Sequence, residues 1–158
     1  MHTTAYHPPR GRGGFSLAEI LIVLVIMGIA AAMAVPRLQG LVKTSSIQGA
    51  LNRVAADLSY ARIRAIRTGS RAQLAIASDG KSYTVVEDPA GAAPVTRKTV
   101  NLSLEYPDLV LSPAPGVVSF DSRGMLRATG GINVVRATKQ GRTDSLRVSG
   151  VGMIYRDY

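Results

Sequence analysis

One acid, Glu19, lies near the start of an otherwise uncharged apolar run. Residues 20–35 are all apolar or glycine, and the next charged residue downstream is Arg37. A charged side chain costs about 2.5–3.5 kcal/mol at the centre of a membrane helix, less near an end, and it usually has a partner. Because Glu19 has no charged neighbour in its own segment, its partner must come from another chain, a lipid headgroup or a chain terminus.

The remaining residue types leave little for catalysis. The chain has no cysteine, which excludes disulfides, thiolate zinc sites and cysteine nucleophiles, and its only histidines, His2 and His7, precede the apolar run. A chain without that upstream segment lacks the usual general base and the commonest metal ligand. We therefore expect a protein that is not an enzyme and has no cofactor. No metal site is expected either, because Asp121, Asp144 and Asp157 do not have the spacing of a calcium loop.

The segment that must position Glu19 is long enough to cross a bilayer. Residues 15–36 number 22, and a helix of that length spans about 33 Å, against about 30 Å for the hydrocarbon core. Two ordinary interpretations are a secretory signal peptide, cut among the alanines at 30–34, and a plain uncleaved anchor. Both leave Glu19 without a function.

A third interpretation comes from the residues around Glu19. Gly14, Phe15 and Glu19, followed by the apolar run, resemble the leader motif of type IV prepilins, in which Gly precedes Phe and Glu is the fifth mature residue. The resemblance implies that a membrane-embedded prepilin peptidase cuts between Gly14 and Phe15 and methylates Phe15. It further implies that Glu19 neutralises the terminal amine of a neighbouring subunit during filament assembly. Pro36 would be the twenty-second mature residue, where pilin-like helices often carry a proline.

The same resemblance implies an orientation in the bacterial inner membrane. Residues 1–14 would be the leader, and its Arg10 and Arg12 would stay in the cytoplasm, as the positive-inside rule also indicates. Residues 15–36 would be the membrane and assembly helix, in contact with inner-membrane lipid before assembly, and the C-terminal domain would be periplasmic. Removal of the leader would lower the formal charge from +9 to +7.

Beyond Pro36, apolar residues recur at helical spacing as far as residue 65. This predicts one helix from about Phe15 to Thr68, with residues 37–69 as its amphipathic continuation and Gly69 as its C-cap. Charged residues also share one face of this helix: Arg53, Asp57, Arg64, Arg67 and Arg71. We interpret them as a solvated face with one ion pair at Asp57; a contact with acidic neighbouring subunits and a DNA-binding stripe are the alternatives.

After Gly69 the pattern changes to short β-like runs separated by turn residues, which predicts an antiparallel β domain over residues 70–158. The candidate strands are residues 71–77, 82–88, 95–106, 109–112, 117–121, 132–138, 144–149 and 153–156. Asp79 and Gly80 form a hairpin signal between the first two, and residues 87–94 are a predicted loop. The predicted fold class is therefore α+β, a long helix packed on a sandwich-like β domain, as in pilins.

A second resemblance narrows the family to the GspH/FimT minor pseudopilins. The end of the helix matches a pattern of that family at Asp57, Leu58, Ala61, Arg62, Ala65, Ile66 and Arg67. Further along, Phe120 and Gly124 match a strand and the turn after it, and residues 145–156 resemble the final hairpin. Where the family often has Glu, this chain has Arg64, so a contact that depends on that Glu is not carried over.

The charge of +9, from 19 basic and 10 acidic residues, raises the question of an anionic partner. Some FimT-like pilins bind DNA through a basic C-terminal segment, but the corresponding residues 152–156 here lack the arginine cluster. The candidate residues for an anion or DNA contact are instead the basic residues of the last strands: Arg136, Lys139, Arg142, Arg147 and Arg156. Ordinary exposure on a hairpin is the alternative explanation.

The sequence thus predicts a minor pilin or pseudopilin of a type II secretion system or type IV pilus. Its expected partners are prepilin peptidase and other subunits of a filament, which it would join or prime. One alternative is a DNA-binding minor pilin of a DNA-uptake pilus, and another is a single-pass, membrane-anchored periplasmic domain that never polymerises. The chemical identity of the mature N-terminus distinguishes the last alternative from the other two.

Overall fold

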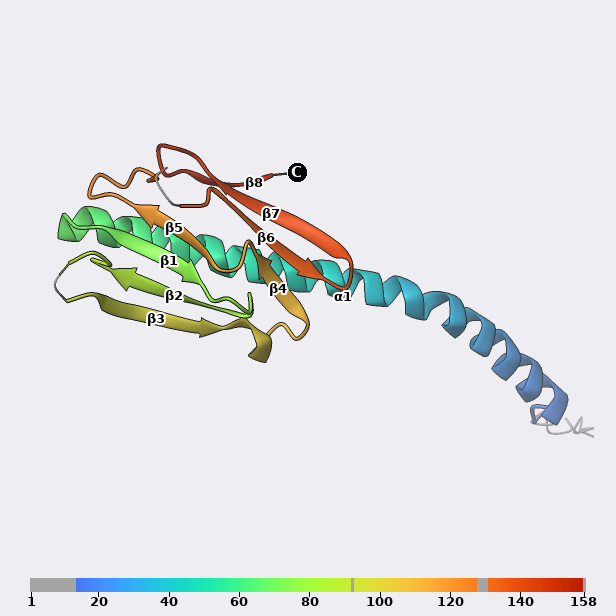
Figure 1. The fold of residues 1–158 in the computed structure, drawn as a ribbon. Helices are drawn as coiled ribbons and strands as arrows, with labels where there is room; N and C mark the ends of the chain where they lie inside the picture. Colours follow the sequence, from blue (N-terminus) through green and yellow to red (C-terminus); the bar gives the residue numbers. More distant parts are fainter. Residues whose placement is uncertain (1–13, 92, 128–130, 158) are drawn as a thin grey trace, which may run out of the picture. The chain divides into compact units, whose positions relative to one another are not determined.

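The computed structural model of the 158-residue chain describes residues 14–91, 93–127 and 131–157, without the side chains of residues 35–39, 41 and 157. Two compact units make up the chain, residues 1–39 and residues 40–158. Helix α1, Leu17–Thr68, contributes to both (Figure 1). Residues 17–68 therefore form one long helix, as predicted, although its first residue is Leu17 and not Phe15.

In the first unit, α1 is apolar on all sides. The segment Leu17–Ala34 has a mean hydropathy of 2.6, none of it is buried, and it is long and apolar enough to cross a membrane. A helix that is apolar all round needs an apolar environment to bury it, which is a bilayer or other chains.

In the second unit, α1 is amphipathic and ends where the sequence predicts. The positions that recur at helical spacing, among them Leu51, Val54 and Leu58, are fully buried. Gly69 follows Thr68 with φ +63°, the left-handed conformation in which glycine commonly ends a helix. The predicted C-cap is therefore confirmed.

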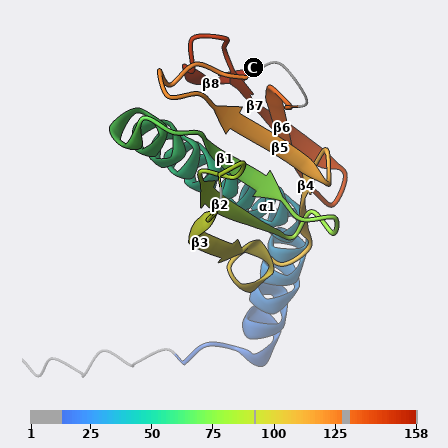
Figure 2. The ribbon, with the colours of Figure 1, turned by 60° about the vertical axis from the view of Figure 1, so that its left-hand side comes forward.

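Within the described part of the chain, eight strands follow the helix in two antiparallel sheets (Figure 2). The first sheet has the order β3-β2-β1-β5, and the second has the order β4-β6-β7-β8. The strand bounds are β1 Ala72–Ile76, β2 Ser82–Glu87, β3 Val95–Asn101, β4 Leu109–Ser112, β5 Gly116–Phe120, β6 Val134–Lys139, β7 Arg142–Val148 and β8 Ile154–Asp157. This arrangement confirms the predicted α+β class.

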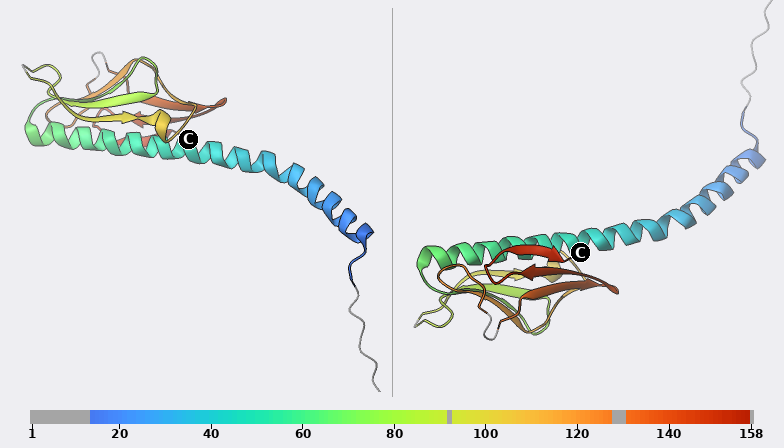
Figure 3. Two further views of the ribbon diagram at one scale, coloured as in Figure 1. Left: turned by 90° about the horizontal axis from the view of Figure 1, so that it is seen from below. Right: turned by 90° about the horizontal axis from the view of Figure 1, so that it is seen from above.

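Both sheets lie on the same side of the C-terminal part of α1 (Figure 3). Buried and partly exposed residues alternate along β1, β2 and β5, so one face of each strand contributes to the core. The largest fully buried side chains include Tyr83 and Phe120 from the first sheet and Leu109 and Leu111 from the second. A single core therefore joins the helix to both sheets.

The predicted strand over residues 95–106 is wrong in its second half. β3 ends at Asn101, and a 3₁₀ helix, Leu102–Leu104, follows it. The Asn101 side chain accepts a hydrogen bond from the Ser103 N–H at 3.0 Å, and Leu102 is fully buried. The side-chain cap and the buried leucine favour the turn over a continued strand.

Candidate functional site

The N-terminal end of α1 is capped by Ser16. Its Oγ accepts a hydrogen bond from the Glu19 N–H at 3.2 Å, and its carbonyl oxygen accepts from the N–H groups of Glu19 and Ile20 at 3.1 and 3.2 Å. Ser followed three residues later by Glu is the spacing of a capping box, a signal that was present in the sequence. Glu19 thus lies in the first helical turn, where the helix dipole favours a carboxylate.

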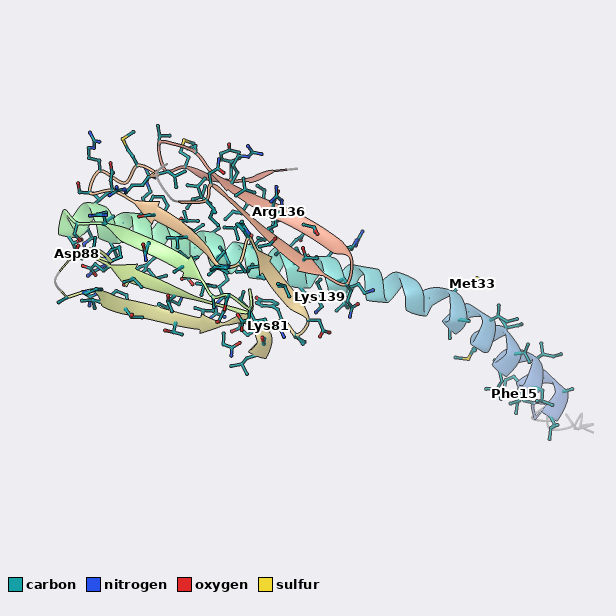
Figure 4. All side chains as sticks on the ribbon, in the orientation of Figure 1. Phe15, Met33, Lys81, Asp88, Arg136 and Lys139 are labelled. Atoms are coloured by element: carbon teal, nitrogen blue, oxygen red, sulfur yellow. The ribbon has the colours of Figure 1, made fainter. Side chains whose placement is uncertain are left out.

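The Glu19 carboxylate lies on an apolar surface. Together with Phe15, Ile20, Val23 and Leu24 it lines a shallow depression of about 260 Å³. Among the residues that the structure describes, its oxygens have no ion-pair or hydrogen-bond partner. Figure 4 shows Phe15 at this end of the helix, where its side chain is 80% exposed. The carboxylate and the aromatic ring are therefore both available to another molecule.

The bond between Gly14 and Phe15 precedes the helix. Residues 14–16 have no regular secondary structure, and nothing lies within 4 Å of the place where a Cβ on Gly14 would be. A peptidase can therefore reach this bond without unwinding α1. The rest of the predicted leader, residues 1–13 with Arg10 and Arg12, lies outside the described residues. Pro36 belongs to α1, but its side chain is outside the described part.

The sequence predicts Asp57 to be a solvated residue that forms an ion pair on the helix face, and the structure differs. Asp57 is only 5% exposed, and its carboxylate accepts hydrogen bonds from the Tyr83 hydroxyl at 2.6 Å and from Lys98 Nζ at 2.5 Å. Burial and the adjacent carboxylate raise the pKa of Tyr83. Asp57 therefore connects α1 to the first sheet, and the prediction of a solvated ion pair is wrong.

Glu87, at the end of β2, makes a second charged connection that sequence reasoning missed. Its Oε2 accepts hydrogen bonds from Arg97 at 2.5 Å and from Arg64 of α1 at 2.6 Å. These guanidinium hydrogen bonds, that of Arg97 foremost, hold the pKa of Glu87 below its usual value of 4.5. Arg53 likewise pairs with Glu105. Three charges of the predicted helix face are thus used within the fold, at Arg53, Asp57 and Arg64.

The Glu87 connection predicts a pH-dependent contribution to stability. Because the folded state lowers the pKa of Glu87 below 4.5, its contribution is fully present above that pH and is lost as the pH falls through the lowered value. We expect Glu87→Gln to have a lower urea midpoint than the parent at pH 7, and the difference to shrink as the pH falls below 4.5. Glu105→Gln removes an acid that is 50% exposed, so it should change the midpoint little. Equal effects of the two variants would contradict this assignment.

The basic residues of the last strands lie on two different faces. Lys139 is buried and donates to Ser46 Oγ at 3.4 Å, Arg142 donates to the Gly40 carbonyl at 3.2 Å, and Arg156 donates to the Gln48 carbonyl at 3.1 Å. These three residues therefore hold the second sheet against α1.

The other two basic residues point away from the helix. Arg136 alternates with the buried Val135 and Ala137 along β6, and Arg147 lies between the buried Leu146 and Val148 on β7. Figure 4 labels Arg136 and Lys139, which both come from β6. Because they are three positions apart on one strand, their side chains belong to opposite faces of the sheet. The fold does not bring the five basic residues together on one surface.

Within residues 14–91, 93–127 and 131–157, no group of three or more His, Asp or Glu side chains gathers that would hold a metal ion. Asp121 instead caps its own turn, accepting hydrogen bonds from the N–H groups of Arg123 and Met125 at 2.9 Å.

Two family models match the chain. The model described as type II transport protein GspH matches residues 50–152, and the model described as prokaryotic N-terminal methylation motif matches residues 9–35. The first match covers the buried half of α1 and most of the β domain, and the second covers Gly14, Phe15 and Glu19. No significant match was found among curated proteins or among solved structures.

Proposed function

Because the chain belongs to the GspH family of type II transport proteins and carries the N-terminal methylation motif, we propose that this pilin-like minor pseudopilin is processed between Gly14 and Phe15 and incorporated into a filament. Its function is then one of assembly, as expected for a family of structural proteins. The observation that carries the proposal is Glu19, a carboxylate without a partner among the described residues, on a helix whose apolar surface is exposed on all sides.

In this mechanism the apolar part of α1 serves in two environments. Before assembly, Leu17–Ala34 spans the inner membrane, with the arginine-containing leader in the cytoplasm and residues 40–158 in the periplasm. Prepilin peptidase cuts after Gly14, leaves Phe15 as the new terminus and methylates it. The exposed bond ahead of the helix supports this step.

After processing, the Phe15 amine supplies the positive charge that Glu19 lacks. A cation and an anion each cost several kcal/mol when desolvated alone, and their attraction is strongest in a low-dielectric environment. Pairing Glu19 of one subunit with the Phe15 amine of its neighbour therefore favours the one register in which the two groups meet. The apolar surface of α1 is buried by neighbouring helices in the same step.

Coexpression of the full chain with a prepilin peptidase tests the processing step. We expect a product that begins at Phe15 and carries an added methyl group, which intact-mass measurement detects. Gly14→Leu places a bulky side chain before the scissile bond, and its leader should be retained. Cleavage of that variant at the same site, or an uncleaved parent protein, would contradict the proposal.

A further inference from the structure

Exposed apolar side chains gather near the C-terminal end of α1. Five of them are between 40% and 61% exposed, two on the helix and three on the turns after β5 and β7. We call this set the distal patch: Ile63, Ile66, Met125, Val151 and Met153. In Figure 1 both turns lie at the end of the second unit where α1 ends. Scattered single apolar residues are ordinary on a protein surface, but a cluster of this kind marks an interaction site.

Arg62 fixes the parts of the distal patch relative to one another. Its Nε donates to the Gly124 carbonyl at 2.9 Å, and its Nη2 donates to the Val151 carbonyl at 3.0 Å. Ile66 packs against Gly124 so closely that a Cβ there would lie 2.6 Å from its Cδ1. One guanidinium therefore ties both turns to α1, and the patch is held in place before any partner binds.

The rim of the distal patch is cationic. Arg67, next to Ile66, is exposed, and the side chain of Arg123, next to Gly124, is 78% exposed. The nearest acid in sequence, Asp121, pairs with the Arg123 guanidinium at 3.4 Å and also accepts hydrogen bonds from the N–H groups of Arg123 and Met125. Arg67 has no ion-pair partner among the described residues, and together with Arg62 it leaves this end of the unit with a net positive charge. A partner that covers the apolar centre would therefore meet positive charge around it.

These features favour one class of occupant. A second copy in a twofold contact would place this cationic rim against the same rim of the other copy, which costs energy. A nucleic acid needs cations along a phosphate backbone, whereas the centre here is apolar. About 39 Å of helix separates Ile66 from Gly40, the first residue of the second unit. The patch therefore lies at the far end of that unit. A protein surface with an apolar centre and an acidic rim fits both parts of the patch.

We propose that the distal patch binds a different pilin-like subunit through a contact face that has an apolar centre and an acidic rim. The inference rests on the proposed function, because it takes the partner from the same filament. It adds a second contact, made by the β domain and the end of α1, to the one that Glu19 makes in the apolar helix.

The test uses the full chain in detergent, with each of the other pilin-like subunits of its own assembly purified in the same way as probes. We expect one of them to bind, and Ile63→Ser, Met153→Ser and Arg67→Glu each to weaken that binding at least about tenfold. Leu104→Ser changes a side chain that is 83% exposed and lies outside the patch, and Lys81→Glu reverses a charge outside it. Both controls should bind as the parent does. Because all five positions are exposed or half-exposed, thermal unfolding followed by circular dichroism should be the same for every variant.

Several outcomes would overturn the inference. It fails if the patch variants bind as tightly as the parent, if no subunit binds, or if Leu104→Ser weakens binding as much as Ile63→Ser. It also fails if Ile63→Ser abolishes only self-association of the chain or only binding to phosphatidylglycerol vesicles. Cleavage at Gly14 is measured in the same preparations. If cleavage is normal and the binding result is negative, the inference fails alone; a chain that is never cut contradicts the proposed function itself.

Discussion

Glu19→Ala is expected to leave cleavage after Gly14 intact and to reduce the amount of this subunit in the filament fraction at least about tenfold. The variant removes the only charge from the apolar part of α1, so the Phe15 amine of the neighbouring subunit would be buried without a counter-ion. That cost falls on assembly and not on the membrane-bound precursor, whose Glu19 carboxylate has no partner among the described residues. Quantitative immunoblotting of the filament and membrane fractions measures the distribution.

Glu19→Gln removes the negative charge but keeps a residue type that suits the start of the helix. Ser16 and Glu19 have the spacing of a capping box, and glutamine is equally suited to the second position of that motif. If the charge is what assembly requires, Glu19→Gln should be as defective as Glu19→Ala, while Glu19→Asp should retain part of the function. Normal assembly of Glu19→Gln would contradict the role of the charge.

Gly152→Ala is expected to destabilise the second unit by about 2–4 kcal/mol. Gly152 has φ +77°, a conformation that costs a residue with a side chain about 1 kcal/mol or more. Its Cβ would also lie 2.1 Å from the Gly124 carbonyl oxygen and 2.7 Å from Arg62 Nε. Relief of that overlap requires the two turns to separate, which breaks the hydrogen bonds of Arg62.

Gly150→Ala is the matched control, since it lies in the same turn. Nothing lies within 4 Å of its Cβ position, and its φ is not positive. We expect this control to change stability by less than about 0.5 kcal/mol. Urea unfolding of the full chain in detergent, followed by far-ultraviolet circular dichroism, compares the two variants. Similar urea midpoints for the two variants would mean that the turns after β5 and β7 can separate without a loss of stability.

The elements of the fold could be predicted because their signals are local. Gly69 ends α1 by its own backbone conformation, and Asp79 and Gly80 form the turn that joins β1 to β2 in an antiparallel pair. Buried positions recur along α1 at the spacing that the sequence shows. The error at residues 102–106 arose because apolar alternation alone does not distinguish a strand from a capped turn with one buried leucine.

The connections between elements could not be predicted, since their partners are far apart in the sequence. Asp57 and Lys98 are 41 residues apart, and Arg62 and Val151 are 89 apart. A helix face with several arginines looks solvated until the acids that meet it are known, and Glu87 comes from a strand whose register the sequence does not specify. The N-terminal motif was recognisable for the opposite reason: Gly14, Phe15 and Glu19 form one short, continuous pattern.

Assembly through the processed N-terminus is tested most directly by the mass of this subunit's N-terminal peptide, recovered from filaments purified from cells in which it is made. A peptide that begins at Phe15 and carries one added methyl group is expected, because in the proposed mechanism only a subunit cut after Gly14 supplies the amine for Glu19 of its neighbour. A protein that still carries residues 1–14, that begins near the alanines at 30–34, or that is present in the membrane and never in the filament would contradict it.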